Sequence, residues 1–307
     1  MTMLCGFALP GPASLAQETQ DDVADEPEDH ASLVFVADPD GSKMRLLSFM
    51  PEYRFQGSSD WSRDGKLIAF DTWRGTNGEE GVRYGKIGIV DADGGDARIL
   101  GDGVMPSLSP EGDRLAFSHS GKGVLLMDLS GDAPETELID ASGWGTAWSP
   151  DGASIAYGRG GNLVIYDVAK DDKRTIFNDE ASPYQYIKWN FAWSADSLKI
   201  AFQGVLEDKS TILAIVDARG AEFGHTIRYI GAFEPTLCWS PDGNQILFAA
   251  NCPQRNNLRQ IYSINPNDWS PPYLLPEQAT NRSITDMTFS PDGTTLTFTA
   301  SRPVKTE

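Results

Sequence analysis

The stretch Trp148-Ser149-Pro150-Asp151-Gly152 decides the fold, because it recurs along the chain. An identical copy begins at Trp239. Degraded or altered copies begin at Trp61, Leu108, Trp193 and Phe289, so the steps between copies are 47, 40, 45, 46 and 50 residues. A fixed period of about 20 to 50 residues is typical of repeat architectures.

The motif has the composition of a tight turn between two strands. Proline presets φ at the second turn position, Asp suits the third, and Gly accepts the positive φ needed where the chain re-enters a strand. A short apolar run follows every copy, as expected for strands buried on both faces. These predicted strands are Lys66–Phe70, Arg114–Phe117, Ser154–Tyr157, Lys199–Phe202, Gln245–Phe248 and Thr295–Phe298.

Each unit continues with two more strands. Third strands are predicted at residues 86–90, 124–128, 163–167, 212–216 and 260–264, and shorter fourth strands at, for example, 98–100 and 174–177. A hairpin of residues 32–37 and 43–48 has no motif before it, whereas the last copy is followed by a single strand. The two halves complement each other. The chain is therefore predicted to be an all-β, six-bladed β-propeller with four strands per blade, whose last blade is closed by the N-terminal hairpin.

The motif W-S-P-D-G followed by I-A-F resembles the WD40-like PD40 repeat of TolB-type propellers, and the resemblance covers residues 31–300. It implies the propeller fold, but this repeat serves many unrelated roles. TolB proteins carry an α/β domain before the propeller that docks with inner-membrane partners. Here an acidic stretch stands in that place, so the resemblance does not extend to a full Tol–Pal role.

The first sixteen residues carry no charge and resemble the later part of a secretory signal peptide, with small residues at Ser14-Leu15-Ala16 before a cleavage at Gln17. The basic start of such a peptide is missing, and a disordered apolar N-terminus is the alternative. Residues 17–30, which hold seven acids and no Lys or Arg, are predicted to be a disordered linker. The propeller then spans residues 31–303. These segments predict a periplasmic or otherwise exported protein.

Composition restricts the partners. The net charge is −19, from 44 acidic and 25 basic residues. Nucleic acid is a poor partner for such a chain, because phosphate binding needs a basic footprint. No stretch after the leader is long and apolar enough to span a membrane. We expect a soluble monomer.

Three cysteines are present. Cys5 lies in the leader. Cys238 should pair across its hairpin with a residue near position 247, so Cys252 lies several residues further along. A disulfide between Cys238 and Cys252 would require the loop to fold back, and two buried thiols are the alternative.

Propeller topology puts the motif turns and the turns between third and fourth strands on one face, the motif face. This face is rich in Asp, and Asp91-Ala-Asp93-Gly-Gly-Asp96 could suggest a calcium loop. It lacks the Glu and the spacing of an EF-hand, and Asp and Gly are also what hairpin turns require. We therefore interpret the motif residues as structural, and the motif tryptophans as packing groups between blades.

The opposite face collects aromatic and basic residues with few acids, which is the composition of interface hot spots. The residues predicted to bind a partner there are Tyr53, Arg54, Trp73, Arg74, Trp144, Tyr186, Lys188, Trp189, Phe233, Arg255 and Arg282. The alternative is that the aromatic residues plug the channel mouth or pack between blades.

Catalytic signals are weak. His30, His119 and His225 lie in different units and do not have the spacing of a metal site. There is no G-x-S-x-G nucleophile motif. We expect no catalytic residue, metal or cofactor. The first hypothesis is a non-enzymatic, exported scaffold that binds a protein of the cell envelope through the opposite face. The alternative is a glycan-binding protein or lyase that acts on an anionic sugar in the central funnel.

Overall fold

The computed structural model describes residues 31–75, 83–131, 135–177, 182–268 and 270–304. The predicted leader and the whole acidic linker, His30 included, lie outside them. The fold is all-β apart from short 3-10 turns such as η2 (Ala221–Phe223) and η3 (Pro253–Arg255). None of the described helices is both long enough and apolar enough to cross a bilayer.

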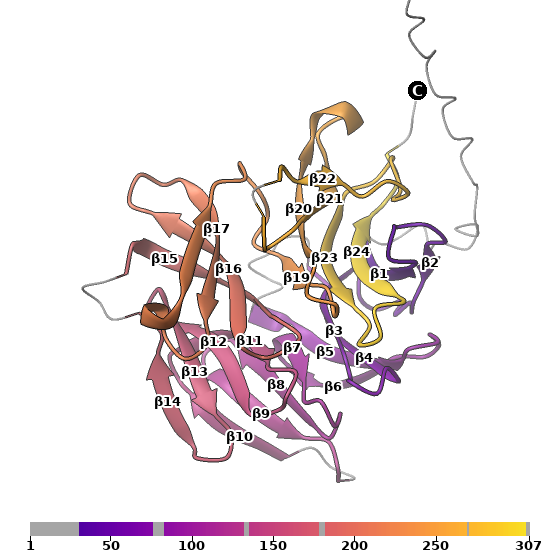
Figure 1. Ribbon diagram of the computed structural model, residues 1–307. Coiled ribbons are helices and arrows are strands. Elements are labelled where there is room, and N and C mark those ends of the chain that lie inside the picture. Colours follow the sequence, from indigo (N-terminus) through magenta and orange to yellow (C-terminus); the bar gives the residue numbers. More distant parts are fainter. Residues whose placement is uncertain (1–30, 76–82, 132–134, 178–181, 269, 305–307) are drawn as a thin grey trace, which may run out of the picture.

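The strands form units of four (Figure 1): four units are separate four-stranded sheets, and the other two share one eight-stranded sheet that is joined at Ser32↔Phe55. Unit 1 comprises β3 (Phe55–Trp61), β4 (Leu67–Trp73), β5 (Lys86–Asp91) and β6 (Arg98–Asp102). Unit 2 comprises β7 (Val104–Leu108), β8 (Arg114–His119), β9 (Gly123–Asp128) and β10 (Glu135–Asp140). Unit 3 comprises β11 (Gly143–Trp148), β12 (Ser154–Arg159), β13 (Asn162–Asp167) and β14 (Asp172–Thr175).

Two further units follow the same plan. Unit 4 comprises β15 (Tyr184–Trp193), β16 (Lys199–Leu206), β17 (Thr211–Asp217) and β18 (His225–Arg228). Unit 5 comprises β19 (Leu237–Trp239), β20 (Ile246–Cys252), β21 (Leu258–Ile264) and β22 (Tyr273–Leu274). The second strands predicted from the apolar runs are confirmed, and most extend beyond the predicted ends.

The last unit joins the two ends of the chain. It comprises β23 (Ile284–Phe289), β24 (Leu296–Ser301), β1 (Ser32–Ala37) and β2 (Arg45–Leu46). β1 pairs antiparallel with β24 from Ser32↔Ser301 to Ala37↔Leu296, so the expected pairing of the N-terminal hairpin with the last strand is confirmed (Figure 1). β2 is shorter than predicted and pairs with β1 through only two residues.

The motif works as a turn in the way its composition indicates. In the unit 3 copy, Gly152 donates its N–H to the Ser149 carbonyl at 2.9 Å and adopts φ 75°. The Ser149 hydroxyl donates to Asp151 at 2.6 Å and accepts the N–H of Ser154 at 2.9 Å, which fixes the start of β12. In each of the other copies, the motif serine hydroxyl likewise accepts the backbone N–H of the residue five positions further on.

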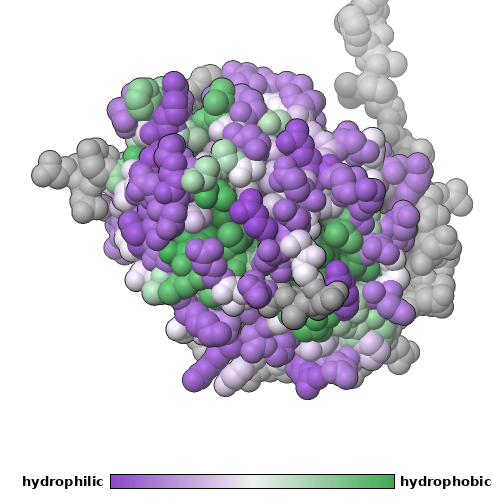
Figure 2. Space-filling model, turned by 90° about the horizontal axis from the view of Figure 1, so that it is seen from below, coloured by the Kyte–Doolittle hydropathy of each residue, from purple (hydrophilic) through white to green (hydrophobic). Residues whose placement is uncertain are grey.

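The cores lie between neighbouring units. One cluster packs Val34 and Val36 of β1 against Ile68 and Phe70 of unit 1, and another joins buried residues of units 3 and 4. Motif tryptophans bridge units as well: Trp193 donates to the Ala147 carbonyl at 2.9 Å. Figure 2 shows one side of the molecule as mostly hydrophilic, with apolar side chains gathered in two separate places. Burial between units therefore supplies the main apolar core.

Candidate functional site

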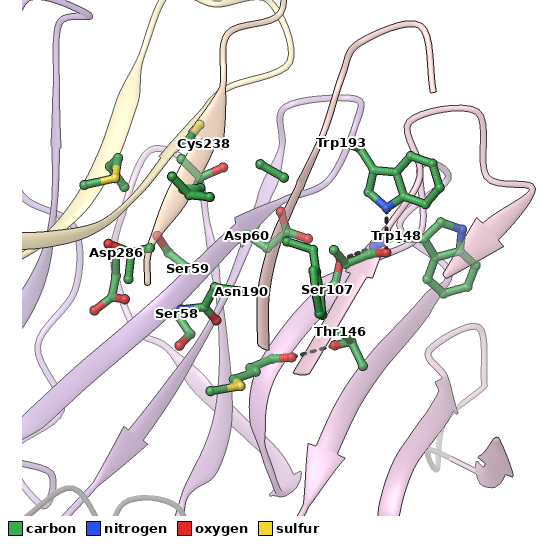
Figure 3. A pocket seen from close by; sticks show the side chains of 18 of the residues that line it. Ser58, Ser59, Asp60, Ser107, Thr146, Trp148, Asn190, Trp193, Cys238 and Asp286 are labelled. Atoms are coloured by element: carbon green, nitrogen blue, oxygen red, sulfur yellow. Dashed lines mark hydrogen bonds between the residues drawn. The ribbon is translucent and has the colours of Figure 1, made fainter. Parts of the chain in front are cut away.

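A central channel lies where the innermost strands face one another. β3, β7, β11, β15, β19 and β23 contact in this order, and β23 also contacts β3. The cavity between them has a volume of about 250 Å³ and takes lining residues from all of these strands. Many of the lining side chains are polar (Figure 3), among them Ser58, Ser59, Asp60, Ser107, Thr146, Asn190 and Asp286.

β-Bulges interrupt most of these innermost strands beside the channel. The ladder register shifts within β3, β7, β11, β15 and β23. Four of the shifts contain a residue with positive φ: Ser58 at 43°, Met105 at 53°, Gly145 at 69° and Asp286 at 51°. An extra residue leaves the local backbone unpaired and re-aims its side chains, and such bulges concentrate near functional sites.

Carboxylates belong to this channel region. Asp60 accepts the N–H of Leu108 at 2.8 Å and thereby ties unit 1 to unit 2. Its side chain is mostly buried although it lines the cavity, and this desolvation raises the pKa of Asp60 to about 6. Burial also raises the pKa of Asp286.

Asp71 of β4 is 4% exposed and lies behind the innermost strand. One of its carboxylate oxygens accepts the N–H of Met105 at 2.9 Å. Desolvation, with a further contribution from the negative charge of Asp286, raises the pKa of Asp71 to about 7. A β-carbon on Gly57 would lie 3.1 Å from Asp71 Oδ1 and 3.7 Å from Asp286 Oδ2, so both carboxylates lie beside this glycine.

Sequence reasoning did not select these three aspartates. Asp71 carried the clearest signal, because it interrupts the apolar run Leu67–Trp73, where a charge is expensive to bury. Asp60 immediately precedes a motif Trp, and no sequence pattern distinguished it. Asp286 gave no signal of its own, since its place depends on the bulge in β23.

Cys238 also lines the channel and pairs with Leu247 across its hairpin, as predicted. Cys238 and Cys252 are both buried free thiols, so the disulfide alternative does not hold. Burial raises the pKa of Cys238 to about 12, which keeps the thiol protonated and unreactive. Among the described residues, no group of three or more His, Cys, Asp or Glu side chains could hold a metal ion.

A second candidate region, called here the rim cluster, consists of Trp144, Tyr186, Lys188 and Trp189. The Lys188 ammonium lies 5.1 Å from the centre of the Tyr186 ring and 5.6 Å from that of Trp189. Trp189 is 39% exposed, which is unusual for so large an apolar side chain. The structure therefore brings together Tyr186, Lys188 and Trp189, and Trp144 precedes Gly145, which lies against the Trp189 backbone.

The bulge in β15 presents this cluster. Ile187 pairs with Gly204 and Phe191 pairs with Phe202, so three residues of β15 face only one of β16. Lys188 and Trp189 belong to these three. The motif turn of unit 4 lies at the Trp193 end of the strand, where Trp193 pairs with Ile200. The bulge, at residues 188–190, lies in the middle of the strand, between this end and the Tyr184 end.

Four more predicted residues gather in unit 1. The Arg74 guanidinium lies 5.2 Å from the centre of the Tyr53 ring and forms an exposed ion pair with Glu52. Trp73 stacks on Phe55 with ring centres 5.4 Å apart. The Arg54 carbonyl accepts the N–H of Ala31 at 2.8 Å. This group is therefore separate from the rim cluster of units 3 and 4.

The remaining three predicted residues serve the packing of units 4 to 6. Arg282 is 3% exposed, with its guanidinium 5.3 Å from the centre of the Phe35 ring. Phe233 is buried and packs edge-on against Phe248. Arg255 is partly buried and contacts Gln260, which also donates to the Arg282 carbonyl at 2.9 Å. Because Arg282 and Phe233 are covered by the fold, the prediction that all eleven residues share one open surface is wrong.

Solved structures show which architecture this is. A putative TolB from Agrobacterium tumefaciens superposes with a TM-score of 0.67 at 16% identity, covering 89% of this chain and 99% of that one. A TolB from Acinetobacter baumannii gives 0.58 at 18% identity, covering 91% of this chain and 66% of that one. The β-propeller domain of Cps50 (Swd1) from Myceliophteria thermophila gives 0.52 at 12% identity, covering 81% and 83%. The chain has a TolB-like β-propeller fold.

The likeness is one of fold. No family model matches the chain, and no curated protein matches its sequence. No family model identifies the PD40 repeat, and what the solved structures show is the TolB-like β-propeller fold. At these identities the propeller neighbours establish the architecture, and function has to be argued from the site.

Proposed function

We propose that the chain is a closed, six-bladed propeller. The support is that the innermost strands contact one another in chain order and that β23 contacts β3. The pairing of β1 with β24 supplies the third strand of the last blade from the start of the chain. Closure of this kind removes exposed inner edges, which suits a monomeric scaffold.

We further propose that this propeller is a non-enzymatic scaffold that binds a protein partner through the rim cluster. The observation that carries the proposal is the exposed Trp189 on the β15 bulge, with the Lys188 ammonium over two aromatic rings. Trp and Tyr dominate binding hot spots because they bury a large area with few rotatable bonds. A rigid bulge reduces the entropy that such a contact loses on binding.

The alternative, an anionic sugar in the central channel, is less well supported. The channel holds Asp60 and Asp286, and Asp71 lies just behind its wall. With pKa values of about 6 and about 7, Asp60 and Asp71 are at least partly ionised at neutral pH and repel an anion. Hydroxyl and amide side chains dominate the rest of the polar lining. The channel therefore fits an anionic sugar poorly.

We propose export to the periplasm, supported by the uncharged first sixteen residues and the small residues before Gln17. The partner would then be a protein of the cell envelope. The test is capture of envelope proteins by tagged chain, followed by a titration with the purified partner. A Lys188→Ala/Trp189→Ala variant should lose the partner, whereas Phe223→Ala should keep it. Phe223 is an exposed aromatic residue beneath Arg219 in the same unit, but at the motif face.

A further inference from the structure

A second cavity lies away from the central channel, between units 1 and 2. Its volume is about 740 Å³, within the range of about 300 to 1,000 Å³ of small-molecule sites. Its walls come from the ends of β5, β6 and β8 and from the segments beside them. The lining residues, which define the basic pocket, are Tyr53, Arg74, Gly75, Arg83, Tyr84, Gly85, Lys86, Asp102, Gly103, His119 and Ser120.

The charge of this pocket contrasts with that of the molecule. Arg74, Arg83 and Lys86 line it against one carboxylate, Asp102, although the whole chain has a net charge of −19. Lys86 pairs with Asp102 on the wall. Arg83 forms no ion pair with any residue that the structure describes. Among the described lining residues, positive charge therefore exceeds negative charge.

Arg74 and Arg83 each form a cation–π contact with a tyrosine ring. The Arg74 guanidinium lies 5.2 Å from the centre of the Tyr53 ring, and that of Arg83 lies 5.7 Å from the centre of the Tyr84 ring. A guanidinium stacked on a ring keeps its N–H groups in the plane, available to a ligand. Planar N–H pairs match the oxygens of a carboxylate or phosphate. The ion pair of Arg74 with Glu52 is exposed, so it competes only weakly with a ligand.

Hydrogen-bonding groups complete the lining. His119 Nδ1 lies 2.7 Å from the Ser120 carbonyl, which can only accept, so Nδ1 carries the proton. Nε2 of the neutral ring is then an acceptor. The Asp102 carboxylate accepts too, and the Ser120 hydroxyl can donate or accept. These groups suit the hydroxyls of a polyol.

Backbone hydrogen bonds and buried side chains hold the walls of the pocket in place. Gly103 donates its N–H to the Gly85 carbonyl at 2.9 Å, which ties two walls together. A β-carbon on Gly103 would lie 2.5 Å from the Phe117 ring and 2.9 Å from Ile87 Cδ1. The buried side chains of Phe117 and Ile87 therefore pack directly against the Gly103 backbone at this wall. The pocket rests on buried side chains of both units.

We propose that the basic pocket binds a small hydroxylated oxyanion, such as a uronic acid or a sugar phosphate. Arg74 and Arg83 bind the carboxylate or phosphate, and His119, Ser120 and Asp102 contact hydroxyls. The shared chemistry is an oxyanion on a polyol, and the experiment separates its two forms. The site is distinct from the rim cluster, which lies between units 3 and 4.

Calorimetric titration of the purified chain tests the proposal with galacturonate, galactose phosphate and neutral galactose. We expect saturable binding of at least one of the two oxyanions, weakening with added salt, and galactose at least about tenfold weaker. Binding of galacturonate alone identifies a carboxylate site, and binding of galactose phosphate alone identifies a phosphate site.

Arg74→Gln/Arg83→Gln should weaken oxyanion binding about tenfold or more, because it removes both guanidinium groups. Arg98→Gln on β6 is the matched control, since Arg98 is an exposed arginine of the same unit outside the pocket, and it should bind like the wild type. Circular dichroism melting confirms that each variant is folded. The proposal is overturned if neither oxyanion binds at up to about 10 mM, if galactose binds equally well, or if the double variant binds unchanged.

Discussion

The backbone of Trp189 lies directly against Gly145 of the neighbouring unit. A β-carbon on Gly145 would be 2.1 Å from the Trp189 carbonyl oxygen and 2.7 Å from Trp189 Cβ. Gly145 also has φ 69° and donates its N–H to the Ser118 hydroxyl at 2.8 Å. The bulge that exposes Trp189 is therefore supported by a glycine that no other residue can replace without movement.

Gly145→Ala should destabilise the protein and displace the rim cluster, because the new methyl group meets backbone atoms that cannot rotate away. Gly243→Ala is the matched control: Gly243 has φ 75°, but nothing lies within 4 Å of its added β-carbon. In the control, backbone strain should lower the free energy of unfolding by only about 1–2 kcal/mol. Gly145→Ala should lower it by more. Urea unfolding measures both, and equal losses would contradict the close contact.

Partner binding should depend on the rim cluster. Lys188→Ala/Trp189→Ala should weaken the captured partner by about 2 kcal/mol or more, roughly thirtyfold in the dissociation constant. The loss comes from the large aromatic contact and the cation above it. Surface titration with the purified partner measures the effect. Phe223→Ala should leave affinity within about twofold, and an unchanged double variant would refute the site.

Stability should fall as the pH rises from about 4 to about 7. Burial raises the pKa of Asp71 from 3.8 to about 7 and that of Asp60 to about 6. The folded protein then holds protons that the unfolded chain has released, so the contribution is present below about pH 4 and is lost as the pH rises through the folded values. Asp71→Asn should flatten this dependence in urea unfolding from pH 4.5 to 8.

Asp64 provides the control of opposite sign. Contacts with Lys66 and Ser62 lower the pKa of this exposed turn carboxylate to about 2. Its stabilisation is present above about pH 4 and lost as the pH falls toward 2. Asp64→Asn should therefore leave the slope between pH 4.5 and 8 unchanged. If Asp71→Asn also leaves the slope unchanged, Asp71 is not one of its sources.

The motif serine Ser149 should contribute more to stability than Ser154, five residues further on. Ser149→Ala removes both the bond to Asp151 and the acceptor for the Ser154 N–H, and should cost about 1–2 kcal/mol. Ser154→Ala keeps that N–H and should have little effect. Thermal melting of the two variants distinguishes them. Equal melting temperatures would show that the serine does not organise the turn.

Neither Cys238 nor Cys252 should react with iodoacetamide in the folded protein at neutral pH. Both thiols are buried, and the pKa of Cys238 is raised to about 12, so it holds almost no thiolate. Both should label fully in denaturant. Peptide mapping reads each position separately, and rapid native labelling at position 238 would show that the channel wall opens.

The sequence by itself determined the repeat, the turns and the strands. Ser, Asp and Gly at fixed offsets can satisfy a turn from local bonds alone, so copies such as Ser149-Pro-Asp-Gly152 identify the hairpin between the first and second strands of each unit. The positions of the motif copies also predicted that Cys238 pairs with a residue near position 247 and that the N-terminal strand pairs with the last one. It also selected Trp144 and Trp189, because they stand outside the repeat.

Only the tertiary structure decided which of the selected residues face solvent and where the charges lie. Arg282 and Trp189 both lie shortly before a motif copy, yet Phe35 from the other end of the chain covers the first and a bulge exposes the second. Asp71 reaches Asp286 across more than two hundred residues of sequence. Such contacts depend on bulges and on the packing of neighbouring units, which are long-range properties that a local pattern does not encode.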